Sequence, residues 1–456
     1  MTVPTTGSFG TANMRAGQFN SPDFPTIYNP KTRQPFPNNI INVPLDPVAL
    51  KMQDVFPQPN LPGYVNNAQG SVTNTSPFLK FFGRLDYNIS DRNRLTFSIT
   101  QRDNPAFYGS LDCPWDCQTG VVDSYNAQVS DVWTISANVV NEFRLGFTRQ
   151  GNWFTPQTLG QGVPQDLGLN YAKADVAPQV QINGTCCSWI GPATNAIYVQ
   201  NSFDPSDVIT LIKGRHILKF GGELLAYQDN STPWGNVNSG TFSFSGVFTQ
   251  SAPFGSGGVG YADFLLGQVD SWNASNTPIV GMRQKSPQFF VQDDFKVRPN
   301  LTLNLGLRYQ IQGGWHEVAN RIGAFDPTIT NPVTNTLGAI WFAPNNGRNS
   351  IQSPIHNIFL PRVGLSWSPK SNWVVRGGFG IYSYNWSMDR YADNAKGFGT
   401  NSTGSLSETD QVSPVFLLSD PSPPLNYVVA SRDPGAYNGQ SVPYYPYDTP
   451  VARNYQ

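Results

Sequence analysis

Hydrophobic and polar residues alternate along much of this chain. Between Leu301 and Tyr309 every odd-numbered residue is apolar, and every even-numbered residue is polar or a glycine. Such a period of two gives a β-strand one apolar and one polar face. A second extended run, Phe289–Val297, precedes the first and is joined to it by residues 298–300. These residues therefore predict a β-hairpin with a tight turn.

The same hairpin unit recurs along the chain. Further pairs of alternating segments flank predicted turns near residues 90–93, 138, 213–215 and 369–372. We expect about a dozen strands, nearly all of them in tight hairpins.

The connections between successive hairpins are far longer than the turns. They run over residues 102–126, 151–201 and 313–359. Loops of this length are unusual in a compact soluble domain, whereas short turns at one end and long loops at the other are typical of an outer-membrane β-barrel. We therefore predict an all-β fold, an antiparallel transmembrane outer-membrane β-barrel with long extracellular loops. A soluble β-sandwich or barrel with inward apolar faces would show the same alternation.

The low charge content favours the membrane barrel over the soluble fold. Charged residues make up 13% of the chain, whereas about a quarter is typical of soluble domains. Aromatic residues also reach 13%, and they favour both membrane interfaces, while charges facing lipid are costly. The aromatic residues expected in the interfacial girdles are Trp133, Tyr309, Trp367, Trp373 and Tyr382. The formal net charge of −1 argues against binding to nucleic acid.

The sequence divides into three segments. Residues 76–385 contain the barrel hairpins. Residues 1–75 are rich in Pro, Asn and Gly and predict a long irregular loop segment, with one short helix near 46–56 that Asp46 can cap. Residues 386–456 predict an irregular loop without a closing strand, so that the barrel is expected to be partial.

Four cysteines occur as two close pairs, Cys113 with Cys117 and Cys186 with Cys187. The first pair fits the spacing of zinc ligands loosely, but the matching second pair that a zinc site requires is missing. All four cysteines fall in long loops, which a barrel places outside the cell, where disulfides persist. We expect disulfides and no metal site, and the pairing among the four cysteines stays open.

No motif predicts an enzyme or a bound cofactor. Residues 255–260 match G-x-G-x-x-G, but they lack the preceding buried strand and the acidic residue that a dinucleotide site requires. The three histidines cannot be paired with a nucleophile from the sequence, although His316 and Glu317 lie in a long loop and could contact a ligand. We therefore predict no catalytic residues.

Charged residues on the polar strand faces are a better functional lead. In a barrel this face lines the lumen. Most of these charges are expected to pair with one another. The lumen-facing residues that we select as candidates for ligand binding are Arg84, Glu223, Arg308 and Arg376.

Several motifs, taken in their order along the chain, resemble the barrel of TonB-dependent receptors, and most closely its Oar-like, Acidobacteria-type group. Each motif alone is weak, but together they span most of residues 1–385. The motifs are Val3-Pro4-Thr5, Arg15–Phe19, Asp46–Ala49, Pro57–Asn60, Gly214–Glu223, Ala262–Gly267, Phe290–Val297, Leu301–Tyr309, Pro361–Pro369 and Val375–Tyr382.

The resemblance implies a receptor in the cell outer membrane that binds a ligand at its extracellular loops and admits it through the lumen. Its implied partners are outer-membrane lipid, an unknown small ligand and the TonB complex. Similar proteins contact TonB through a plug and a TonB box that precede the matched part, so the chain is expected to be an internal segment of a larger barrel. Siderophore, oligosaccharide and peptide all fit the sequence, and a role in adhesion or protein secretion stays open.

A secreted soluble β-rich adhesin or glycan-binding module is the alternative function. In this interpretation Trp115, Trp189 and Trp315 would form aromatic platforms for a polysaccharide. The two functions differ in a simple property, since only the adhesin would be a water-soluble monomer without detergent.

Overall fold

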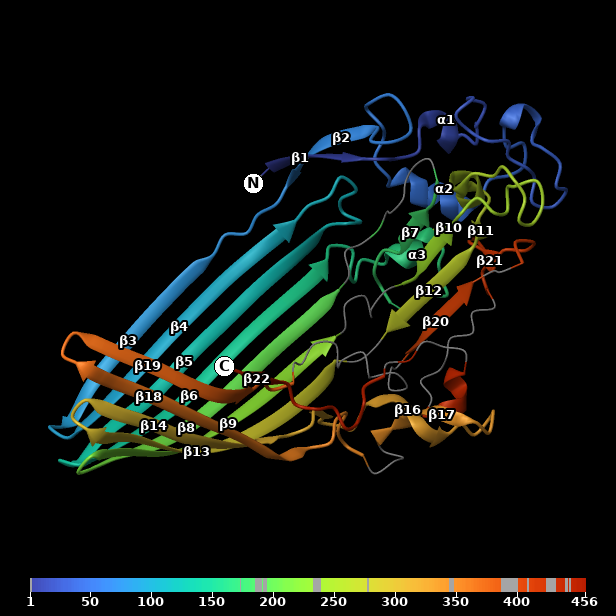
Figure 1. Cartoon of the computed structure of the whole chain (residues 1–456). Coiled ribbons are helices and arrows are strands. Elements are labelled where there is room, and N and C mark those ends of the chain that lie inside the picture. Colours follow the sequence, from blue (N-terminus) through green and yellow to red (C-terminus); the bar gives the residue numbers. More distant parts are fainter. Residues whose placement is uncertain are drawn as a thin grey trace.

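The computed structural model is built around one large antiparallel β-sheet (Figure 1). The sheet curls, so that the ribbons of its last strands cross those of its first strands in this view. The residues that the structure describes are 2–172, 174–184, 191, 195–232, 239–276, 279–343, 348–386, 401–407, 410–423, 432–438, 442 and 444–456.

The large sheet contains 12 strands in the order β22-β19-β18-β14-β13-β9-β8-β6-β5-β4-β3, with β15 also paired to β13. Every neighbouring pair is antiparallel. In the described part of the chain, β3 and β22 are the two edges of the sheet. The strands are β3 (Leu79–Ser90), β4 (Asn93–Tyr108), β5 (Gln118–Ser136), β6 (Val139–Pro156), β8 (Ala196–Lys213), β9 (His216–Thr232), β13 (Val280–Arg298), β14 (Leu301–Gln312), β15 (His316–Glu317), β18 (Ile355–Lys370), β19 (Trp373–Ser383) and β22 (Arg453–Tyr455).

The predicted hairpins are confirmed, and so is the difference between the two ends of the sheet. Five pairs of consecutive strands are joined by only two residues each, at 91–92, 137–138, 214–215, 299–300 and 371–372. Figure 1 shows these turns together at the lower left and the long connections at the opposite end. We call these the turn end and the loop end.

The sheet exposes its apolar side chains on one face. Val291 lies opposite Phe220 on one side and Leu307 on the other, so the three side chains point to the same face. They are 40%, 45% and 43% exposed, in that order. In a neighbouring row of the same face, Leu305 lies opposite Val363, which lies opposite Phe379, and these last two are 51% and 53% exposed. Period-two alternation is thus present as predicted, and the described residues leave these side chains of the apolar face exposed.

The connections at the loop end fold into a cap, whose elements surround the ends of the strands (Figure 1). Its helices are α1 (Ala12–Arg15), α2 (Pro47–Asp54), α3 (Val163–Leu167) and α4 (Gly260–Leu265), with 3-10 turns at Pro37–Asn39 and Pro434–Tyr437. Its strands are β1 (Thr2–Gly7), β2 (Ala68–Thr73), β7 (Gln179–Ile182), β10 (Thr241–Phe244), β11 (Gln268–Val269), β12 (Ser271–Asn276), β16 (Gly323–Thr330), β17 (Leu337–Phe342), β20 (Asn401–Ser407) and β21 (Phe416–Leu417).

The cap has a hydrophobic core of its own, built from segments far apart in the sequence. Phe264 of α4 lies 5.9 Å from Phe56 and 5.3 Å from Phe244, measured between ring centroids. Phe264 and Phe244 have no exposed area, and Trp272 of β12 is 1% exposed. The long connections are therefore not structureless, because burial of these side chains holds them together.

Helix α2 begins at Pro47, and Asp46 caps it by accepting hydrogen bonds from Val48 N at 2.9 Å and Ala49 N at 3.1 Å. The helix ends at Asp54, two residues before the end of the range expected from the sequence. At that end Arg15 donates to the backbone carbonyls of residues 53, 56 and 57. One of these carbonyls, that of Gln53, belongs to the last helical turn, and the arginine ties the first loop segment to α2 and to the residues that follow it.

Cys113 and Cys117 form a disulfide, with their Cα atoms 5.2 Å apart. The bond closes a small loop around Trp115, which is 3% exposed and lies 5.6 Å from Phe56. The disulfide therefore holds this tryptophan on the cap core. Cys186 and Cys187 lie outside the described residues.

The two terminal segments contain more regular structure than the sequence suggests. Residues 1–75 were expected to lack strands, yet they contain β1 and β2, which pair with each other. Residues 386–456 were expected to be irregular, yet they contain β20, β21 and β22, which pair with β12, β11 and β19. These strands are short and pair with partners that no tight turn joins to them, so local alternation does not reveal them. In the part of the chain that is described, no helix is long and apolar enough to cross a membrane.

Candidate functional site

Two of the four predicted lumen residues form an ion pair on the polar face of the sheet. Arg308 of β14 reaches across β13 to Glu223 of β9, with Arg308 Nη1 3.1 Å from Glu223 Oε2. The same nitrogen donates to Gln288 Oε1 at 2.7 Å. This bridge links three neighbouring strands, and its charges are satisfied within the protein.

Arg84 lies in a separate, charged trough near the turn end. It forms an ion pair with Asp86 at 2.9 Å, and Arg94 forms a second ion pair with the same carboxylate at 2.9 Å. The trough has a volume of about 470 Å³ and also includes the ion pair between Arg144 and Glu142. Three arginines thus gather around two acids.

Arg376 stands apart from the other three residues. It lies on β19, opposite Ser366 of β18, and it is exposed. In the strand order β19 is near one edge of the sheet, whereas the β3 strand that carries Arg84 forms the other edge. The structure therefore brings Glu223 and Arg308 together and leaves Arg84 and Arg376 separate.

A pocket of about 370 Å³ lies on the polar face near the loop end. Its first wall consists of two rows of side chains that cross β6, β8 and β9. Gln150 lies opposite Gln200, which lies opposite Asp229. In the adjacent row Thr148 lies opposite Ser202, which lies opposite Tyr227. The pair next to the second row, Phe147 and Phe203, points to the apolar face, with ring centroids 5.1 Å apart.

The second wall of the pocket comes from parts of the chain that lie far away in sequence. Trp315 follows β14, and Asn385 and Trp386 follow β19. Trp315 Nε1 donates to the carbonyl oxygen of Trp386 at 3.3 Å. Asn385 Oδ1 accepts from Gln310 Nε2 at 2.7 Å. The segment after β19 is thus fixed across the polar face, opposite the two rows.

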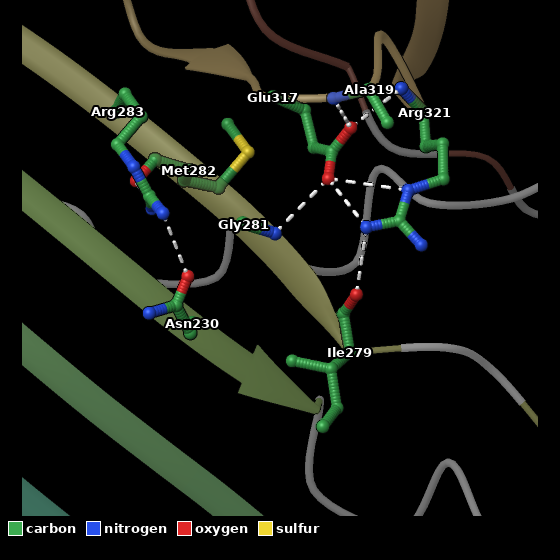
Figure 2. A network of polar contacts seen from close by, with 8 residues as sticks. All are labelled: Asn230, Ile279, Gly281, Met282, Arg283, Glu317, Ala319 and Arg321. Atoms are coloured by element: carbon green, nitrogen blue, oxygen red, sulfur yellow. Dashed lines mark hydrogen bonds and ion pairs between the residues drawn. The ribbon is translucent and has the colours of Figure 1, made fainter.

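Trp315 owes its place to the polar network of Figure 2, which anchors the next two residues to β13. Glu317 lies opposite Met282 in the short β13–β15 ladder. Its side chain has no exposed area and accepts from Gly281 N at 3.1 Å, from Ala319 N at 2.7 Å and from Arg321 Nη2 at 2.7 Å. Burial opposes ionisation here, but these hydrogen bonds hold the pKa of Glu317 below its usual range.

This network changes the interpretation of the His316–Glu317 pair as ligand contacts. The carboxylate of Glu317 is saturated by protein donors, so it fixes the backbone and is not free to bind a ligand. His316 is partly buried beside it and lies opposite Arg283 in the β13–β15 ladder. Neither residue lines the pocket.

The aromatic platforms of the adhesin hypothesis are not supported. Trp115 and Trp315 are 3% and 2% exposed, because one packs on the cap core and the other behind the pocket. Neither can offer a flat exposed face to a polymer. Trp189 lies outside the described residues.

The sequence does not reveal the pocket, although part of its signal is visible there. Gln150, Gln200 and Tyr227 occupy polar-face positions near the loop-end termini of three strands, which periodicity could have identified. Nothing in the local sequence shows that Asn385 and Trp386 return across this face. Among the described residues, no group of three or more Asp, Glu, His or Cys side chains is arranged to hold a metal ion.

Comparisons with known proteins place these observations in a family. The model of the outer membrane beta barrel domain family matches residues 2–456. No curated protein matches the chain significantly.

Similar solved structures include the alcaligin outer membrane receptor FauA from Bordetella pertussis, with 9% identity and a TM-score of 0.38 over 77% of this chain and 43% of that chain. They also include the outer membrane transporter YddB from Escherichia coli, with 9% identity and a TM-score of 0.37 over 71% and 43%. FpvA from P. aeruginosa, solved bound to pyoverdines, shows 11% identity and a TM-score of 0.40 over 74% and 40%. The chain spans less than half the length of these three proteins.

The family match covers nearly the whole chain, and it explains why an apolar sheet face is left uncovered, since that face of an outer-membrane barrel contacts lipid. The predicted fold class and location are thereby confirmed: this chain belongs to the outer membrane beta barrel domain family and is a protein of the cell outer membrane.

Proposed function

We propose that the chain is the ligand-binding and translocating part of a TonB-dependent receptor of the Oar-like group. The observation that carries this proposal is the pocket at the loop end, which lies on the polar face of the sheet, at the end where the long connections fold into a cap. A ligand captured there would stand at the entrance of a polar lumen that continues through the Glu223–Arg308 bridge to the charged trough at the turn end. The sequence motifs that resemble TonB-dependent receptors support the same function.

Between the pocket and the turn end, the polar face suits passage of a ligand better than tight binding. Two charged pairs on it, Arg84–Asp86 and Arg308–Glu223, are already formed within the protein. A ligand that leaves the pocket would therefore not meet a free charge at these two pairs. Arg376, which is exposed on β19, is the one residue of the four proposed for lumen contacts that stands outside these bridges.

Uptake by intact cells tests the proposal. Cells with and without the gene are given labelled probes of three kinds, a ferric hydroxamate siderophore, a neutral oligosaccharide and a peptide, with and without a protonophore. We expect one probe to accumulate only in cells with the gene, and this accumulation to disappear with the protonophore, because TonB transmits the proton-motive force.

Two results would contradict the proposal in different ways. Gene-dependent accumulation that survives the protonophore would show a passive pore without TonB coupling. Gene-dependent probe binding at the surface, without accumulation under any condition, would favour adhesion instead of transport.

A further inference from the structure

We infer that the loop-end pocket binds a neutral, polyhydroxylated ligand, that is, a short segment of an oligosaccharide. This inference rests on the proposed function and names the ligand class of the same site. It follows from the charge, the hydrogen-bonding groups and the aromatic surface of the pocket, which are considered in turn.

The charge of the pocket disfavours anionic ligands. Asp229 is the one acid among the described residues that line it, and none of those residues is a lysine, an arginine or a histidine. An anionic ligand would bring its charge next to this carboxylate without a cation in the pocket lining to compensate, since Arg283, which acts on Asp229, is not among the lining residues. Ligands such as carboxylates and phosphates are therefore poor candidates.

The carboxylate of Asp229 favours a ligand that donates a hydrogen bond. The residue is 4% exposed, and its Oδ2 atom accepts from Gln200 Nε2 at 3.0 Å. Its Oδ1 atom is buried and has no partner at hydrogen-bond geometry in the described part of the chain, although the Ser231 hydroxyl group is close enough to act on the same carboxyl group. A buried oxygen without a donor destabilises the structure. A ligand hydroxyl group that donates to it would remove this penalty.

The other polar groups of the pocket match hydroxyl groups. Side-chain amides dominate, and an amide offers both a donor and an acceptor, as a sugar hydroxyl does. Two of these amides are held in place by protein contacts. Gln200 Nε2 donates to Asp229 Oδ2 at 3.0 Å, and Asn385 Oδ1 accepts from Gln310 Nε2 at 2.7 Å. Such preorganised amides lose little entropy when a ligand binds.

Aromatic surface completes the match. Tyr227 and Trp386 are partly exposed on opposite walls of the pocket. Trp315 of the second wall packs against Tyr227, with ring centroids 6.3 Å apart, and its hydrogen bond to the Trp386 carbonyl fixes Trp386. The C–H faces of a sugar ring pack on such aromatic surfaces while its hydroxyls meet the amides. The volume of about 370 Å³ lies at the small end for ligand pockets, so the pocket takes a short segment of a longer chain.

Binding to the protein purified in detergent tests the inference. Tryptophan fluorescence and calorimetry are recorded with neutral trisaccharides (maltotriose, cellotriose and mannotriose), with the cationic glucosamine trimer, with anionic trigalacturonate and with a ferric hydroxamate siderophore. We expect a neutral trisaccharide to bind and to quench the fluorescence, and trigalacturonate not to compete.

Variants locate the binding. Asp229→Asn and Trp386→Ala should each weaken binding of the neutral trisaccharide about tenfold or more, whereas Trp386→Phe, which keeps a ring, should stay within about threefold of the parent protein. Gln292→Ala is the matched control, because it removes the same kind of amide from the same sheet face outside the pocket, and its affinity should be unchanged.

Three results would overturn the inference. The first is that no neutral trisaccharide binds, and the second is that only the cationic trimer binds. The third is that trigalacturonate or the siderophore binds and that Trp386→Ala abolishes this binding. The uptake experiment separates these failures from failure of the proposed function. A protein that imports a labelled siderophore or peptide, and binds no sugar, keeps its function as a receptor and loses only this ligand class.

Discussion

The same kinds of side chain have opposite surroundings in the sheet and in the cap. Phe379 on the sheet is 53% exposed, whereas Phe264 in the cap has no exposed area. The sheet contacts lipid, so its apolar groups need no protein cover, and the cap stands in water, so it must build a core from its own residues. Exposure of apolar groups therefore reports the solvent of each region and not a defect of packing.

The largest effect is expected from a substitution that disrupts the cap core. Phe264→Ala removes a ring that three other aromatic residues contact, and it should lower the free energy of cap opening by about 3–5 kcal/mol. Hydrogen exchange of the cap amides measures this free energy. Phe379→Ala is the matched control on the lipid face and should leave cap exchange unchanged. Equal effects of the two variants would contradict the division into two regions.

The second prediction concerns the lipid face. Leu307→Arg places a charge in lipid and should reduce the free energy of folding into lipid vesicles by about 2–4 kcal/mol near the bilayer midplane. Gln292→Arg, on the polar face one strand away, serves as control and should cost much less. Urea titration in vesicles measures both. If the control were the more costly variant, the assignment of the two faces would be reversed.

A smaller effect is expected for the cap disulfide. Replacement of Cys113 and Cys117 by serine frees a short loop and should destabilise the cap by about 2 kcal/mol, as chain entropy predicts for a loop of this size. Hydrogen exchange around Trp115 should accelerate, while exchange in the barrel strands should not change. Acceleration in the strands as well would mean that cap and sheet open together.

The smallest prediction depends on pH. Burial raises the pKa of Asp263 in α4 to about 7. The native state then binds this proton more tightly than the unfolded chain, so the Asp263 contribution to stability is present below the ordinary carboxyl pKa and is lost as pH rises towards 7 and above.

Asp263→Asn tests this sign. The carboxyl group accepts from Thr249 N, Thr249 Oγ1 and Phe248 N, and the amide should lose about one of these bonds, or about 1 kcal/mol of cap stability at pH 5. The loss should shrink or reverse by pH 9, and the exposed Asp23→Asn should show no such trend. A loss that grows with pH would contradict the assignment. The opposite dependence is expected for the Glu317 network, whose lowered pKa makes its contribution disappear as pH falls.

Prediction from the sequence succeeded where the signal lies in residues close together along the chain. Each hairpin of the sheet combines alternation with a two-residue turn, so both strands and their register follow from adjacent residues, as in Leu301–Tyr309. The N-terminal capping of helix α2 by Asp46 is predictable for the same reason, because the capping residue directly precedes the helix. Prediction failed for β1, β20 and β22, which pair with segments that no tight turn joins to them.

The candidate site, too, has a part that the sequence predicts and a part that it does not. Periodicity placed Glu223 and Arg308 on the polar face, but their pairing across β13 depends on the strand register. The pocket could not be predicted even from the strand register, since Trp315 and Trp386 contact the rows of β6, β8 and β9 only in the folded chain.

The class of structure follows from the amino-acid sequence alone, because alternation, tight turns and low charge are properties of neighbouring residues and of composition. Three features exist only in the folded chain: the packing of the long connections into a cap, the positioning of Trp315 by the Glu317 network, and the place of one buried acid among amides and aromatic rings. These features join residues that are far apart along the chain, and their contacts exist only because burial and hydrogen bonding in the fold offset the entropy of bringing them together.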